Sequence, residues 1–169
     1  MKILGMTGWS GAGKTTLLTK LIPELVRRGI SVSTMKHAHH GFDVDTPGKD
    51  SYEHRAAGAT EVLVGSATRW ALMHEIRGRQ EPTAAELMLR MTPVDLILIE
   101  GFKRENHDKV EIYRESNGKP LLSTGDSTFV AVFSDQAVPE TSLPVIDLND
   151  IQAIAGFIMR HCGFAGSRT

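Results

Sequence analysis

The sequence predicts an α/β fold, with a mostly parallel β-sheet flanked by helices and some antiparallel edge strands. Short apolar runs typical of buried strands recur along the chain, most clearly at residues 2–7, 94–99 and 129–133. Segments with apolar residues at helical spacing, such as residues 15–28, alternate with these runs. Strands that alternate with helices imply right-handed crossovers and helices on both faces of the sheet.

Composition indicates one globular domain, residues 1–169, because 169 residues suffice for one well-formed core but are few for two. The net charge of -1 argues against non-specific nucleic-acid binding, which needs a basic excess. The single cysteine, Cys162, allows no internal disulfide. No apolar run is long enough for a membrane span or a signal peptide. We therefore expect a cytoplasmic protein without nucleic-acid or membrane partners.

The elements can be placed in chain order. After the first strand, residues 15–28 form a helix that Pro23 should kink, and Asp50 or Ser51 should cap a short second helix. The other expected elements are strands at residues 30–35, 61–65, 69–74, 94–99, 109–114 (as an edge strand) and 129–133, a helix with a capping box at Thr83, and a last helix with capping-box spacing from Asn149.

A glycine-rich segment joins the first strand to the first helix. Its residues 8–15, GWSGAGKT, match the pattern G-x-x-x-x-G-K-[ST] in full. Such glycines let the backbone turn tightly and point its N–H groups inward, where they form a phosphate site with the helix N-terminus. The alternative is a glycine-rich turn without function. The full match between a strand and a helix favours a phosphate-binding loop (P-loop) for a nucleoside triphosphate, and hence a P-loop NTPase fold.

Individual residues of the P-loop have separate expected roles. Lys14 provides a point charge for the β- and γ-phosphates and is one of two predicted catalytic residues. The hydroxyl of Thr15 is a ligand for Mg²⁺, and Thr16 reaches the α-phosphate. The remaining expected nucleotide contacts are Gly8, Ser10, Gly11, Ala12 and Gly13.

A carboxylate ends the third strongly apolar strand, in VDLILIEG at residues 94–101. Ligands of parallel sheets bind outside the carboxyl ends of the strands. Glu100 is therefore placed to hold Mg²⁺ through water or to orient an attacking water, as the second predicted catalytic residue. The alternative for Glu100 is a solvated loop acid.

A polar loop at residues 36–51 leaves the second strand at the same edge. It is open to three interpretations. It is a switch-like loop, with Lys36 on a phosphate and Asp50, in preference to Asp45, on Mg²⁺; or a plain solvated loop; or a transition-metal site. The candidate ligands for a transition metal are His37, His39, His40, Asp43 and Asp45, without the spacing of a structural zinc site.

Two further features bear on the ligand. Lys49, Arg55, Lys103 and Arg104 flank the predicted phosphate site and suggest a second anionic ligand. The tetrapeptide Asn-Lys-x-Asp, which reads guanine in many GTP-binding proteins, is absent. Asp135, which follows a buried strand, is the nearest candidate for reading the base, with a turn residue as the equal alternative.

Four segments together resemble the MobB family, molybdopterin-guanine dinucleotide biosynthesis protein B. They are GWSGAGKTTL at residues 8–17, KHAHHGFDVDTPGKDS at 36–51, AAGA at 56–59 and DLILIEGFK at 95–103. The P-loop alone is unspecific, whereas the histidine-aspartate loop combined with the EGFK ending is much more specific. The resemblance runs from about Ile3 to Lys103.

The resemblance implies a protein that binds GTP with Mg²⁺, hydrolyses it slowly at best, and assists a MobA nucleotidyltransferase, which joins GMP to molybdopterin. It also implies a homodimer with a sheet continuous across both subunits, for which residues 61–74 and 109–114 are candidate edges. Glu100 would then be a metal ligand and the P-loop nucleotide-binding, with molybdopterin or another phosphorylated compound as second ligand. A small-molecule kinase or ligase with an arginine lid at residues 77–79, and a metallochaperone GTPase that uses the histidine loop, stay open as alternatives.

Overall fold

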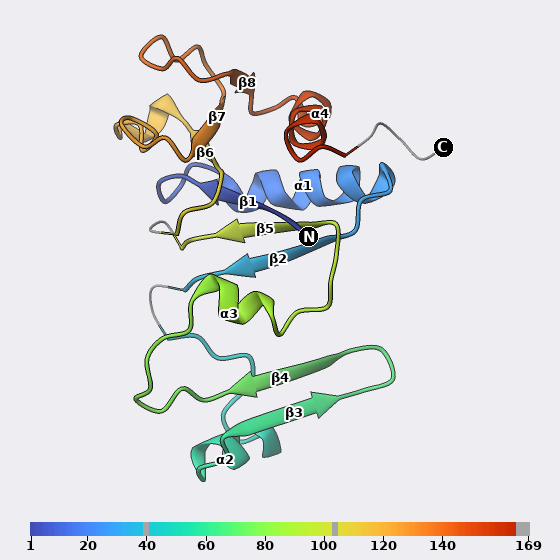
Figure 1. The fold of residues 1–169 in the computed structure, drawn as a ribbon. Helices are drawn as coiled ribbons and strands as arrows, with labels where there is room; N and C mark the ends of the chain where they lie inside the picture. The colour runs from blue at the N-terminus through green and yellow to red at the C-terminus, as the bar shows by residue number, and fades with distance from the viewer. Residues whose placement is uncertain (39–40, 103–104, 165–169) are drawn as a thin grey trace. The chain divides into compact units, whose positions relative to one another are not determined.

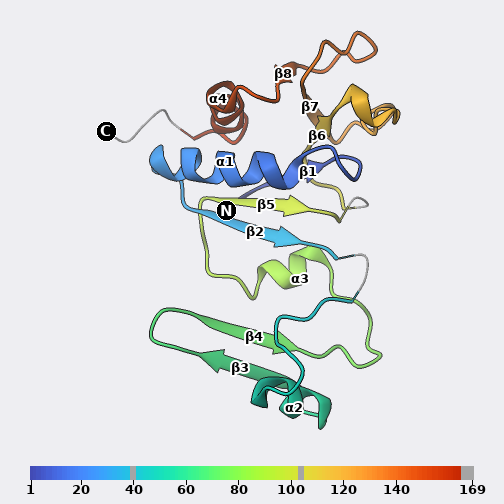
Figure 2. The ribbon, with the colours of Figure 1, turned by 180° about the vertical axis from the view of Figure 1, so that it is seen from behind.

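The computed structural model describes residues 1–38, 41–102 and 105–164. The chain divides into two compact units. The larger unit comprises Met1–His37 and Thr92–Thr169, and the smaller unit comprises Ala38–Met91. Figures 1 and 2 show their elements from opposite sides. That both units form one domain stays a prediction. Among the helices of the described residues, none has the length and apolar character of a membrane span.

The larger unit is built on a six-stranded sheet in which every pair of neighbouring strands is parallel. The strand order is β2-β5-β1-β6-β7-β8. The strands are β1 (Lys2–Thr7), β2 (Val32–Lys36), β5 (Leu96–Glu100), β6 (Lys109–Tyr113), β7 (Phe129–Ser134) and β8 (Val145–Asp147). The predicted α/β fold class is confirmed, and the predicted antiparallel strands form a separate sheet in the smaller unit.

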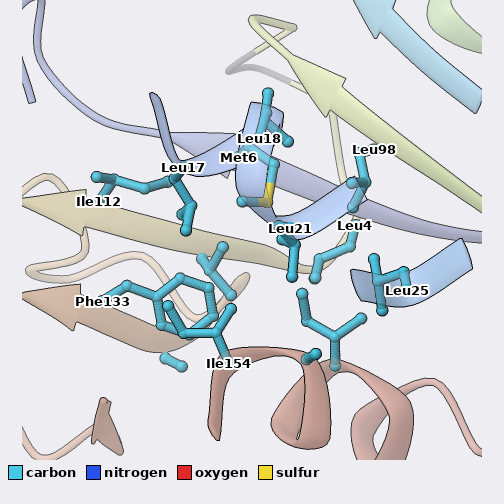
Figure 3. Close-up of a cluster of buried hydrophobic side chains, with 14 of the residues drawn as sticks. Leu4, Met6, Leu17, Leu18, Leu21, Leu25, Leu98, Ile112, Phe133 and Ile154 are labelled. Carbon is cyan, nitrogen blue, oxygen red and sulfur yellow. The ribbon is translucent and has the colours of Figure 1, made fainter. Parts of the chain in front are cut away.

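Helices α1 (Lys14–Arg27) and α4 (Ile151–His161) pack against each other beside this sheet (Figure 1). Between them lies the core, in which side chains from both helices and from the strands point toward one another (Figure 3). Leu4, Leu21, Phe133 and Ile154 are all completely buried there. Each such side chain contributes about 1.5–3 kcal/mol to folding by leaving water. This core fixes the start of α1, and with it the end of the P-loop.

Helix termini differ in detail from the sequence expectation. Helix α1 runs without a break across Pro23, and the kink expected there stays a prediction. Helix α2 (Asp50–Ala56) starts after Lys49, so neither Asp50 nor Ser51 caps it. Asp150, and not Asn149, caps α4. Its carboxylate accepts a hydrogen bond from a backbone N–H of the first turn. The capping box of α3 (Ala84–Met88), which begins at Thr83, is confirmed.

Strand β6 corrects a prediction, because it lies between β1 and β7 and is not an edge strand. Charged residues alternate with apolar ones in β6, which suggested an edge strand. Two of these charged side chains, Lys109 and Glu111, are instead buried and hydrogen-bonded. The ammonium group of Lys109 donates to the backbone oxygen of Glu105 at 2.7 Å and to the hydroxyl of Thr128 at 2.9 Å. Glu111 is completely buried and accepts two backbone N–H bonds. Charged groups are tolerated inside a protein when their hydrogen-bonding capacity is used.

The smaller unit contains the predicted hairpin, in which β3 (Glu61–Gly65) pairs with β4 (Trp70–His74). Helix α2 packs beside β3. Leu63 and Leu72 are directly paired across the two strands, and their side chains are exposed. Trp70, two residues before Leu72 on the same face, is 66% exposed. The hairpin therefore presents an exposed apolar face formed by Leu63, Trp70 and Leu72.

Candidate nucleotide-binding site

The P-loop runs from the end of β1 to the start of α1. Glycine is required at its three glycine positions for different structural reasons. Gly11 and Gly13 have φ angles of 82° and 93°, in the left-handed region that favours glycine. A Cβ atom on Gly8 would lie 2.5 Å from the backbone oxygen of Ile112 in β6. Thr15 and Thr16 stand in the first turn of α1, where backbone N–H groups lack partners within the helix. The loop therefore has the backbone form that an anion site at a helix N-terminus requires.

Lys14, the first residue of α1, lies over its own loop. Its ammonium group donates to the backbone oxygens of Gly8 at 2.8 Å and Trp9 at 3.0 Å. These acceptors hold the charge against the loop. Phosphate oxygens form stronger, charge-assisted bonds with an ammonium group than neutral carbonyls do. The arrangement therefore suits the predicted role of Lys14, which stays a prediction.

Glu100 and Lys36 meet at the carboxyl edge of the sheet, as the strand order predicts. They pair in register between β5 and β2, and the Lys36 ammonium group lies 3.8 Å from the Glu100 carboxylate. Met6, two residues before the P-loop, pairs with Glu100 on the other side. The Glu100 side chain is 13% exposed. A mostly buried acid thus stands next to the strand that leads into the P-loop, as a Mg²⁺-side carboxylate requires.

Residues that sequence reasoning missed pack against the outer side of the P-loop. They come from the segment after β6, which includes the short 3-10 helix η1 (Glu115–Asn117). Arg114 donates from Nε to the backbone oxygen of Ala12 at 3.2 Å, and Asn117 donates to that of Ser10 at 3.4 Å. Arg114 follows β6 at the same edge of the sheet at which Glu100 ends β5. The rule that found Glu100 would have found Arg114, had β6 been assigned to the sheet interior.

Asp135, the candidate for reading the base, is engaged by Arg114. Its Oδ2 atom accepts from Nη1 of the guanidinium group at 2.7 Å. Its Oδ1 atom is buried and has no hydrogen-bond partner in the described part of the chain. The structure thus brings Asp135 to the P-loop through Arg114. Asp135 as a reader of guanine stays a prediction.

A small pocket lies on the same side of the P-loop. It is lined by residues that include Gly13, Thr16, Arg114 and Asn149, and its volume is about 30 Å³. Arg114 and Lys20 are the charged side chains among its lining residues.

The polar loop and its surroundings belong to the smaller unit, apart from Lys36 and His37. Asp43 and Asp45 pair with the guanidinium group of Arg55 at 2.7 and 2.8 Å. Arg55 is thus neutralised by carboxylates, which does not favour its predicted role on an anionic ligand. Asp50 is exposed at the start of α2, and its Mg²⁺ role stays a prediction.

Other predicted features divide between described and undescribed residues. In residues 1–38, 41–102 and 105–164, no group of three or more His, Cys, Asp or Glu side chains could hold a metal ion. His39, His40, Lys103 and Arg104 lie outside the described residues. Arg77, from the expected arginine lid, donates to the backbone oxygens of Arg55 and Ala59 at 2.9 Å.

Comparisons with known proteins agree with this architecture. The family described as molybdopterin guanine dinucleotide synthesis protein B (MobB) matches residues 3–135. A molybdopterin-guanine dinucleotide biosynthesis adapter protein from Escherichia coli is 44% identical over 160 residues, covering 93% of this chain and 91% of that protein. One of the same name from Haemophilus influenzae is 42% identical over 159 residues, covering 92% and 86%.

The likeness extends to the three-dimensional fold. A crystal structure of molybdopterin-guanine biosynthesis protein B superposes with a TM-score of 0.75, at 25% sequence identity. The superposition covers 94% of this chain and 99% of that one. The matched residues contain the P-loop, the polar loop, Glu100, Arg114 and Asp135. The parallel sheet, the glycine conformations of the P-loop and these matches together place the chain in the MobB family of P-loop proteins.

Proposed function

We propose that this protein is a GTP-binding adapter in the biosynthesis of molybdopterin guanine dinucleotide. It acts in the cytoplasm with a MobA-type nucleotidyltransferase and hydrolyses GTP slowly at most. The observation that carries the proposal is the P-loop, with Gly11 and Gly13 in the left-handed region and Lys14 held over the loop. Membership of the MobB family, and close relatives named as adapter proteins, support the pathway.

The P-loop residues divide the work of holding GTP-Mg²⁺. The backbone N–H groups of residues 8–16 bind phosphate oxygens, and Lys14 neutralises the β- and γ-phosphates. Thr15 and Glu100 hold Mg²⁺, Glu100 through water. Lys36, which lies 3.8 Å from the Glu100 carboxylate at the same sheet edge, binds a phosphate oxygen in this proposal. Mg²⁺ itself supplies neutralisation of the triphosphate charge.

Guanine selectivity requires a hydrogen-bond acceptor near the P-loop. Asp135 lies at the sheet edge on the P-loop side, and its buried Oδ1 atom has unused capacity as an acceptor among the described residues. The N–H groups of guanine are donors of the kind that such an oxygen accepts. Adenine has no matching pair of donors on that edge. We therefore assign preference for GTP to Asp135, after rearrangement of its bond to Arg114.

We also propose that the chain forms a homodimer through the hairpin of the smaller unit. With β6 in the sheet interior, residues 61–74 are the remaining one of the two edges suggested from the sequence. Leu63, Trp70 and Leu72 are 64%, 66% and 46% exposed on one face of this hairpin. A two-stranded sheet with an open apolar face is marginal by itself and gains stability when another surface covers it.

The test of the proposed function is direct. The affinity for GTP and for ATP is measured by calorimetry with Mg²⁺, and formation of the dinucleotide from molybdopterin is then followed with the transferase, with and without this protein. We expect tighter binding of GTP and faster dinucleotide formation. Equal affinity for both nucleotides, together with no effect on dinucleotide formation, would contradict the proposal.

A lysine variant links the first measurement to the P-loop. Lys14→Ala should abolish triphosphate binding while its far-ultraviolet circular dichroism stays that of the native chain. Lys2→Ala is the matched control, because Lys2 is exposed at the opposite end of β1 from the P-loop. Retained binding by Lys14→Ala would refute the role given to this lysine.

A further inference from the structure

The segment that follows β6 forms hydrogen bonds with the backbone of the P-loop at Ser10 and Ala12. Asn117 donates to the backbone oxygen of Ser10, and Arg114 donates to that of Ala12. Trp9 makes the reverse contact, since its indole N–H donates to the backbone oxygen of Pro120 at 2.8 Å. These contacts join positions about a hundred residues apart in the chain, as the Arg114–Ala12 separation of 102 illustrates.

The two contacted carbonyls have a geometric consequence for the glycines that follow them. In a planar trans peptide, the C=O of one residue and the N–H of the next point in opposite directions. A donor that holds the Ala12 oxygen outside the loop therefore turns the Gly13 N–H to the opposite side. The same holds for the Ser10 oxygen and the Gly11 N–H. Glycine has the most backbone freedom of any residue, so these two amides depend most on such restraint.

The restraining segment is itself fixed at both ends. Glu111, completely buried in β6, accepts the backbone N–H groups of Leu122 at 2.8 Å and Ser123 at 2.9 Å. At the other end, Asp135 at the end of β7 pairs with the Arg114 guanidinium group at 2.7 Å. The guanidinium group thus connects β7 to the P-loop through two of its nitrogens.

We propose that Arg114 and Asn117 are positioning residues that preorganise the Gly11 and Gly13 amides for phosphate, and that Asp135 acts on the phosphate end of the site by anchoring Arg114. The triphosphate then binds to a loop in which these amides already point toward the phosphate site, so the entropic cost of ordering them on binding is lower. The proposal rests on the proposed triphosphate binding, and it gives Asp135 a function that is independent of the nucleobase.

A ligand without a base separates this function from guanine recognition. The affinity for inorganic tripolyphosphate with Mg²⁺ is measured by calorimetry for the native chain, Asn117→Ala and Asp135→Ala. Each variant should bind about threefold to tenfold more weakly, as expected for one hydrogen bond. If Asp135 acted only on the base, its variant would bind tripolyphosphate unchanged. If it acted only through its charge, removal of a negative group would strengthen anion binding.

Asn117→Ala provides the complementary comparison, because it changes no charge. Asp108→Asn is the control for net charge, because it removes one negative charge, as Asp135→Ala does, from an exposed carboxylate at the opposite end of β6 from Arg114. It should bind as the native chain does. A second measurement needs no ligand at all. The NMR order parameters of the Gly11 and Gly13 amides in the nucleotide-free protein should fall in both variants, while amides of β5 stay protected from hydrogen exchange.

The outcomes distinguish this inference from the proposed function. If the native chain binds neither GTP nor tripolyphosphate, the proposed function fails, and the glycine order parameters still decide whether Arg114 and Asn117 order the loop. If the native chain binds tripolyphosphate, and both variants match it in affinity and in glycine order parameters, the inference alone is overturned. A variant in which the amides throughout β5 lose their protection from hydrogen exchange has unfolded. The other variant then decides whether the inference holds.

Discussion

Gly8 illustrates how a single atom constrains the site. A Cβ atom at this position would meet the backbone oxygen of Ile112 at 2.5 Å, and a backbone atom of an interior strand cannot move away alone. Gly8→Ala should therefore displace the start of the P-loop or β6, lower the free energy of unfolding by about 1–3 kcal/mol, and weaken triphosphate binding. Urea denaturation and calorimetry measure the two effects.

Gly41→Ala is the matched control for this substitution. A Cβ atom on Gly41 would meet nothing within 4 Å, and its φ angle lies outside the left-handed region. Its stability and affinity should equal those of the native chain. If Gly8→Ala were as stable and as active as Gly41→Ala, the close approach of β6 to the P-loop would not be a constraint on the native protein.

Side chains differ in how far the sequence alone can locate them. The P-loop was predictable because its residues are consecutive in the chain and each residue type in the motif has a specific chemical role. The carboxyl-edge rule placed Glu100 and Lys36 at the same edge of the sheet but did not pair them. The structure adds that they lie 3.8 Å apart on neighbouring strands. Asn117 gave no local signal, since its contact with the P-loop depends on the path of a chain segment after β6.

At the scale of elements, one buried cluster ties α1 to α4. Glu24 in α1 accepts from Arg27 and from Arg28, which also donates to Gln152 of α4. The hydrogen bonds from Arg27 and then Arg28 lower the pKa of Glu24 from its ordinary value of 4.5 to about 2. A lowered pKa in the folded state means that the ionised carboxylate stabilises the fold at pH values above 4.5.

The acid side of the stability profile should reveal this cluster. As pH falls from about 4.5 to about 2, the unfolded chain takes up the Glu24 proton before the folded chain does, and the stabilisation is lost. Glu24→Gln should therefore be less stable than the native chain at pH 6 and should depend less on pH within that window. Urea midpoints across the window measure the difference. Parallel profiles for the two proteins would exclude Glu24 as a contributor.

Elements were predictable to different degrees for physical reasons. The strands β1, β5 and β7 are mostly apolar on both faces, as interior parallel strands usually are, and this pattern is visible in their sequences. Strand β6 was placed at an edge, because the partners that make Lys109 and Glu111 acceptable inside come from distant loops. The position of β8 was not predicted, since three residues carry too little periodicity.

At the scale of the whole molecule, the prediction concerns the apolar face of the hairpin. Sedimentation equilibrium of the native chain should give twice the mass of 18.5 kDa. Leu72→Lys, which places a charge on the exposed apolar face, should shift the protein toward monomer without unfolding it. Lys119→Glu, an exposed change of charge in the larger unit, should leave the mass unchanged. A native chain of monomer mass would refute the proposed dimer.

The bond between Arg114 and Asp135 has a practical consequence for engineering this protein. One carboxylate faces the purine end of the site in the proposal and also steadies, through a guanidinium group, the amides at the phosphate end. Selection for altered nucleotide preference at position 135 should then return weak binders of every triphosphate. Library design that varies positions 114 and 135 together would let preference change without that loss.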